Sequence, residues 1–122
     1  MHDIREVYEI AIRLKRPDLI PDSFSESILA HIRNEQQNAL IRLSQADLKN
    51  DWAAMEKYAS EAIAEFPTYY HFYWYQAAAR YHTDRKQEAI EPLKVYVKYS
   101  KDEKEYPTAV QWLKEIEAAK PE

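Results

Sequence analysis

The chain has 122 residues, a formal net charge of −4, no cysteine and no glycine. Its length suits one domain, and the missing cysteines exclude disulfides, thiol catalysis and thiolate metal sites. The missing glycines argue against phosphate-cradling loops and tight hairpins, where the backbone depends on glycine. Because Ala, Glu, Lys, Gln and Leu, which are good helix formers, are abundant, the chain is predicted to be all-α.

Charge and hydropathy also limit the partners and the location. Acidic and basic residues are interleaved without a basic block, so we expect no nucleic acid partner. No apolar run approaches the roughly 20 residues of a membrane-spanning helix, and the start of the chain lacks a signal-peptide pattern. We therefore expect a cytoplasmic protein without a membrane span.

The first third of the chain predicts two helices. One covers 3–16, where an apolar stripe has helical spacing, and Pro17 ends it. The capping-box spacing at 23–26 begins the second helix. This helix either bends near Asn34, where the polar stretch RNEQQN interrupts its stripe, or runs straight to about Lys49.

The rest of the chain predicts four more helices, which makes about six in total. They cover 52–66, the aromatic run YYHFYWY and its continuation to His82, a segment that ends near Tyr99, and 107–120. Pro92 falls inside the third of these segments. Since proline removes a helical hydrogen bond, we expect a kink there with Pro92 on the outer side.

A 34-residue offset superposes similar positions of the helical pattern. It places Leu40 on Trp74, Leu43 on Ala77, Ser44 on Ala78, Met55 on Ala89 and Ala59 on Leu93. Both units also have a turn between their two helices, at Asn50-Asp51 and at Thr83-Asp84. The pattern therefore indicates two helix–turn–helix units of the same length.

This period resembles that of the tetratricopeptide repeat. The family's pattern of bulky residue, small residue, Tyr and Ala is matched by Trp74, Ala78, Tyr81 and Ala89 in the second unit. In the first unit, Leu40, Ser44, Trp52 and Pro67 match, whereas Lys101 stands where the second unit would have its terminal proline. The resemblance implies a right-handed array of helical hairpins: divergent N-terminal helices (1–36), unit 1 (37–69), unit 2 (70–103) and a capping helix (104–122), all in one domain.

The resemblance also implies a concave groove that binds a partner. Its positions are Asn38, Ile41, Arg42, Gln45 and Lys49 in the first unit and Phe72, Tyr75, Ala79 and His82 in the second. The helical stripe of Tyr73, Trp74 and Tyr81 is instead predicted to be core. For Phe72 and Tyr75, groove and core are equal alternatives.

The search for reactive groups predicts no enzyme. His31 and Glu35 have the i, i+4 spacing of metal ligands, but no second ligand pair accompanies them, and we expect no metal and no cofactor. The leading hypothesis is a non-enzymatic protein–protein interaction module, an adaptor or small chaperone, that holds a peptide or helix in the groove. The alternatives are a homo-oligomerisation unit that uses the aromatic surface and, less favoured, a helical hydrolase or metalloprotein.

Overall fold

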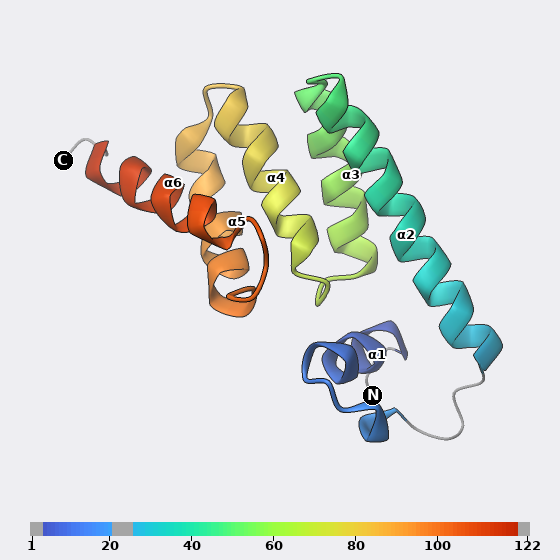
Figure 1. Ribbon diagram of the computed structural model, residues 1–122. Coiled ribbons are helices and arrows are strands. Elements are labelled where there is room, and N and C mark those ends of the chain that lie inside the picture. The colour runs from blue at the N-terminus through green and yellow to red at the C-terminus, as the bar shows by residue number, and fades with distance from the viewer. Residues whose placement is uncertain (1–3, 21–25, 120–122) are drawn as a thin grey trace.

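The computed structural model describes residues 4–20 and 26–119, and within these ranges the regular elements are all helical. The prediction of an all-α fold with six α-helices is confirmed for this part of the chain. The elements are α1 (Ile4–Arg13), the short 3₁₀ helix η1 (Pro17–Leu19), α2 (Glu26–Leu48), α3 (Trp52–Glu65), α4 (His71–His82), α5 (Lys86–Tyr99) and α6 (Tyr106–Ala119) (Figure 1). The predicted capping box at 23–26 lies largely outside the described residues.

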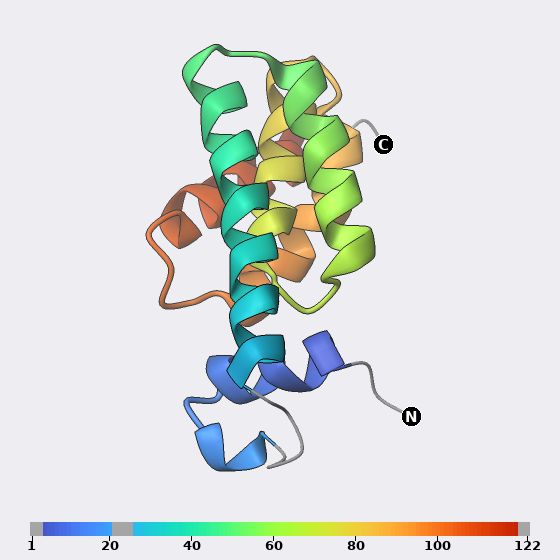
Figure 2. The same cartoon turned by 90° about the vertical axis from the view of Figure 1, so that its right-hand side faces the viewer.

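Helices α2 to α5 stand side by side and run alternately up and down, and α6 crosses α5 at the far end (Figure 1). The strongest contacts join helices that follow one another in the chain, from α2·α3 through α5·α6. Helix α1 lies beneath the array, beside the N-terminal half of α2 (Figure 2). None of the helices in the described ranges has the length and hydropathy that crossing a bilayer requires.

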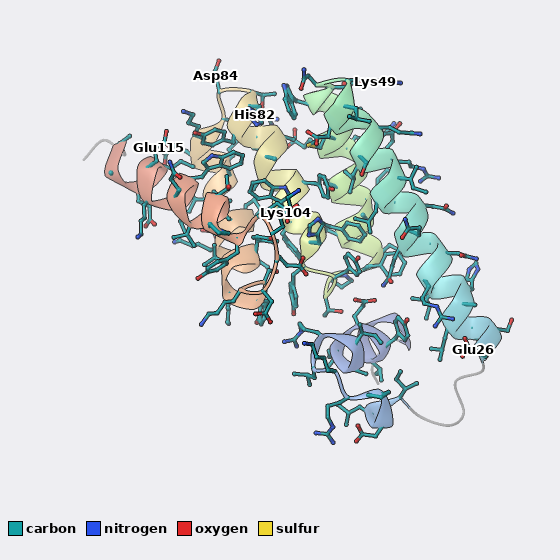
Figure 3. All side chains as sticks on the ribbon, viewed as in Figure 1. Glu26, Lys49, His82, Asp84, Lys104 and Glu115 are labelled. Carbon is teal, nitrogen blue, oxygen red and sulfur yellow. The ribbon has the colours of Figure 1, made fainter. Side chains whose placement is uncertain are left out.

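The pair α2–α3 and the pair α4–α5 repeat with a period of 34 residues. The end of the first helix and both ends of the second recur at this offset: Leu48 and His82, Trp52 and Lys86, Glu65 and Tyr99. In the two turns, Asn50 and Asp84 have φ values of 53° and 59°, in the left-handed region that glycine usually occupies after a helix. These turns lie at the same end of the array, where Lys49 and Asp84 are labelled (Figure 3).

Helix α2 is one continuous helix of 23 residues, so the chain does not break near Asn34. The polar stretch is accommodated because Gln36 is buried and its side-chain amide donates to Glu9 of α1. Pro92 lies inside α5 and is buried, which corrects the expectation that it faces outward. Its ring has no polar side-chain atom, so its burial leaves no side-chain hydrogen bond unsatisfied.

Two clusters form the core of the described part of the chain. The first joins α1, α2, α3 and α4, and its fully buried large side chains include Leu43, Met55, Phe66 and Phe72. The second joins α4, α5 and α6 through alanines and through Leu93 and Tyr96. Trp74 and Trp112 pack against both clusters, with ring centroids 4.9 Å apart.

The predicted core stripe is only partly buried. Tyr73, Trp74 and Tyr81 each keep some exposed surface, but all three pack against the second cluster. Tyr81 also stacks on Trp112 with centroids 3.9 Å apart and an interplanar angle of 3°. The stripe therefore fastens α4 to the helices that follow it, as core aromatic rings do.

Candidate binding pocket

On α4, the structure decides for the core alternative at Phe72 and corrects the groove prediction for Ala79. Phe72 and Ala79 are both 0% exposed and belong to the first core cluster, so they cannot contact a partner in this conformation. The physical reason is that α4 packs closely against α3 and turns this face toward it. Tyr75 is half-buried and lines a pocket together with His71, one turn earlier on the same helix.

The predicted groove residues of α2 are exposed but do not gather around Tyr75. Asn38 and Arg42 line a separate hollow of about 150 Å³ with Tyr58 of α3. Ile41 is 44% exposed, and Gln45 and Lys49 are also exposed. The positions of α2 that do share the pocket with Tyr75 are Leu40 and Ser44, each one residue before a predicted position.

His82, the last predicted groove residue, is exposed at the end of α4. Its ring stacks on Trp52 of α3, with centroids 4.3 Å apart, and meets Trp112 of α6 edge-on at 5.6 Å. His82 lies at the same end of the array as Lys49, away from α1 (Figure 3). It therefore packs between aromatic side chains of two other helices instead of joining the pocket of Tyr75.

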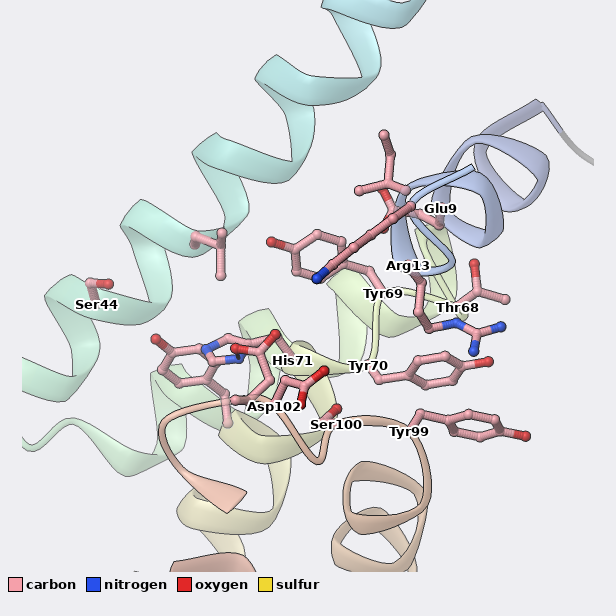
Figure 4. A pocket seen from close by; sticks show the side chains of 15 residues that line it. Glu9, Arg13, Ser44, Thr68, Tyr69, Tyr70, His71, Tyr99, Ser100 and Asp102 are labelled. Carbon is pink, nitrogen blue, oxygen red and sulfur yellow. Dashed lines mark ion pairs between the residues drawn. The ribbon is translucent and has the colours of Figure 1, made fainter. Parts of the chain in front are cut away.

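The pocket of Tyr75 has a volume of about 640 Å³ and lies between α1, α2, the start of α4 and the α5–α6 loop (Figure 4). Helix α1 contributes Glu9 and Arg13, which sequence reasoning assigned to no site. The α5–α6 loop contributes Asp102, which lies across the pocket from α1 in Figure 4, and also Glu103. Nothing in the local sequence pattern relates these segments, because they meet only through the packing of α1 beneath the array.

Glu9 is the most deeply buried acid of the pocket, at 7% exposure. Its burial raises the pKa of the carboxyl from 4.5 to about 7, and the hydrogen bond from the Gln36 amide partly opposes this rise. Burial, together with the charge of Glu9, raises the pKa of Tyr69 to about 12. Near neutral pH the pocket therefore contains a carboxyl close to its titration midpoint and a phenol that stays protonated as a hydrogen-bond donor.

Arg13 closes one end of the pocket. Its guanidinium carbon lies 5.5 Å from the ring centroid of Tyr70 and 5.3 Å from that of Tyr99. These two rings stack on each other with centroids 4.1 Å apart, and Arg13 lies beside both (Figure 4). The cation–π contacts hold the end of α1 against the array and place a positive charge at this end.

Acidic groups gather at the other end. In the described part of the chain, one group of three side chains has the spacing of metal ligands: His71, Glu103 and Glu105, with one ligand atom from each within 4.8 Å of the others. The hydroxyl of buried Tyr96 donates to Glu105 over 3.4 Å. Sequence reasoning missed this group because His71 is far along the chain from Glu103 and Glu105, and the three residues follow no local motif.

Comparison of the chain with family models, curated proteins and solved structures finds no match. The function is therefore inferred from the geometry of the pocket. The pocket combines aromatic surface, hydroxyl groups, a positive end and a negative end, all on a helical array. This combination suits the binding of an elongated ligand that carries both apolar and charged groups.

Proposed function

We propose that this protein is a tetratricopeptide-like, non-enzymatic interaction module that binds a peptide segment of a partner protein in the pocket between α1 and the array. The observation that carries the proposal is the 640 Å³ pocket itself, with walls from α1, α2, α4 and the α5–α6 loop. The 34-residue recurrence of helix ends supports the repeat family. An adaptor or small chaperone is the expected role, and the cytoplasmic location stays a prediction from the sequence.

The two ends of the pocket define the peptide. Arg13 and Lys15 from the end of α1 and the turn after it line one side, where a carboxylate is favoured. Asp102 and Glu103 line the other, where Lys or Arg is favoured. Between them, Tyr75 offers aromatic surface, so we expect an apolar side chain between an acidic and a basic residue of the peptide.

The test is a selection of short peptides on the immobilised protein, followed by fluorescence anisotropy with the selected sequences. Tyr75→Ala should weaken binding by about tenfold or more, because it removes the aromatic surface at the pocket centre. Arg13→Glu should weaken it as well, since it reverses the positive end. Arg42→Glu is the matched control: Arg42 is exposed and lines the separate hollow, so binding should stay unchanged.

Two outcomes would contradict the proposal. Selected peptides that bind Tyr75→Ala as well as the original protein but lose affinity for Arg42→Glu would move the site to the hollow of α2 and α3. Light scattering that shows a dimer, dissociated by Tyr75→Ala, would instead support homo-oligomerisation through the aromatic surface. Circular dichroism of each variant confirms that its helices are intact.

A further inference from the structure

The acidic end of the pocket has a feature that peptide binding does not require. His71 is the first residue of α4, and Glu103 and Glu105 come from the loop that precedes α6. One ligand atom from each of the three lies within 4.8 Å of the other two, and His71 Nδ1 is 4.0 Å from Glu103 Oε2. We propose that His71, Glu103 and Glu105 bind one divalent transition-metal ion, with Zn²⁺ as the best fit.

The three ligand atoms are farther apart than those around a bound zinc ion. Zinc binds imidazole nitrogen and carboxylate oxygen at about 2.0–2.2 Å, so ligand atoms on one tetrahedral ion are about 3.5 Å apart. The ligand atoms must therefore approach one another by about 1 Å. Glu103 is half exposed, with 53% of its side chain accessible, so its rotation is not opposed by packing.

Neighbouring aromatic side chains already orient two of the ligands. The Tyr96 hydroxyl donates to Glu105 Oε2, and Tyr96 is itself fully buried, so this donor is fixed. The His71 ring meets the rings of Tyr75 and Tyr96 edge-on, at 5.2 and 6.2 Å between centroids. Partners of this kind, which hydrogen-bond or position a ligand, raise metal affinity because less ordering is left to the binding step.

The ligand types select the metal. One imidazole with two carboxylates gives a neutral site with a divalent ion, and imidazole favours zinc and its first-row neighbours over Mg²⁺ and Ca²⁺. Three protein ligands leave a fourth zinc position open. Since His71 and Glu103 also line the pocket, a ligand in the pocket can reach an ion held there, and with the ion bound Asp102 supplies the remaining negative charge at this end.

The simplest competing arrangement is a protonated His71 paired with Glu103, without a metal. Isothermal titration of the metal-free, untagged protein with ZnCl₂ separates the two. We expect one equivalent of zinc to bind, and His71→Ala and Glu105→Gln each to weaken binding by about tenfold or more. Binding should also weaken at acidic pH, because protons compete for the same ligand atoms.

The matched control is His31→Ala. Exposed His31 and half-buried Glu35 form an i, i+4 pair on α2, 2.8 Å apart, which is the other place where a histidine meets a carboxylate at close range in the described residues. Zinc binding that survives His71→Ala and Glu105→Gln but is lost in His31→Ala would overturn the proposal. So would the absence of binding heat at about millimolar zinc, well above the range of specific sites. Glu105→Gln keeps the shape of the side chain, so it remains informative even where His71→Ala disturbs the start of α4.

Discussion

Replacing Glu9 by glutamine isolates the effect of one buried charge. Glu9 is 7% exposed, and the Gln36 amide donates to its Oε1. Glutamine keeps an oxygen that accepts this hydrogen bond and has nearly the same shape, but it does not ionise. The variant therefore removes the titration of position 9 and leaves the packing of α1 on α2 in place.

The sign and size of the effect follow from the pKa. Burial raises the pKa of Glu9 from 4.5 to about 7, so the folded protein binds more protons than the unfolded chain between these values. The stabilisation from protonated Glu9 is complete below the lower value and is lost as the pH rises through the upper one. At about 1.36 kcal/mol per pKa unit, the full loss is about 3 kcal/mol. Between pH 5 and pH 8 the original protein should thus lose about 2–3 kcal/mol more stability than Glu9→Gln.

Urea unfolding followed by circular dichroism at several pH values between 5 and 8 measures this difference. Subtracting the curve of Glu9→Gln from that of the original protein cancels the contributions that the two proteins share. Glu61→Gln, which changes an exposed carboxylate of α3, is the control and should leave the pH dependence unchanged. Parallel curves for Glu9→Gln and the original protein would refute the reasoning, because they would mean that Glu9 is solvated. Amide hydrogen exchange in α1 shows whether the loss arises from local detachment of this helix.

Three further substitutions test the array. Glu56 of α3 accepts hydrogen bonds from Arg85 and Arg80, and these bonds lower the pKa of its carboxyl. Glu56→Gln should therefore lower the free energy of unfolding in urea by about 1–2 kcal/mol at pH 7. The difference between the two proteins should shrink as the pH falls through the lowered pKa of Glu56. A cost that stays constant down to acidic pH would contradict this account. Ala79→Leu should lower the free energy of unfolding by about 1–3 kcal/mol, because it overpacks a site that is 0% exposed. A variant as stable as the original protein would mean that Ala79 faces an open groove. Asp84 has a φ of 59°, in the left-handed region that glycine adopts more easily. Asp84→Gly should therefore raise stability in thermal unfolding by up to about 1 kcal/mol. A lower melting temperature would mean that the Asp84 side chain stabilises the turn.

The sequence predicted the helices and their period well because both depend on local signals. Prolines and turn residues mark the helix ends, and the 34-residue offset found in the sequence recurs in the bounds of α2 to α5. The sequence alone could not predict which face of α4 is buried. Hydrophobic periodicity identifies a face by contrast between apolar and polar positions. In the run from Tyr69 to Tyr75 every side chain carries an aromatic ring, so this contrast is missing, and the sequence left groove and core as equal alternatives for Phe72, which is buried.

The candidate site was less accessible to sequence reasoning than the fold. Tyr75 was the one predicted groove residue that the structure places in the 640 Å³ pocket. The other parts of the pocket come from α1 and the α5–α6 loop, which are distant in sequence and meet through tertiary packing. Glu9 gave no signal of burial, since an isolated acidic residue on a helix is usually exposed.

Each helix packs mainly against its neighbours in the chain, and this pattern of contacts also determines how the protein folds and unfolds. Short-range pairings close small loops, so folding should be fast and should start from any adjacent pair of helices. Unfolding of one helix should likewise affect first the helices next to it in the chain. Loss of α6 exposes one side of α5, whereas loss of α4 separates α3 from α5 and divides the array into two pieces. Cooperativity therefore depends on the middle of this chain, and its two ends can open while the centre stays folded.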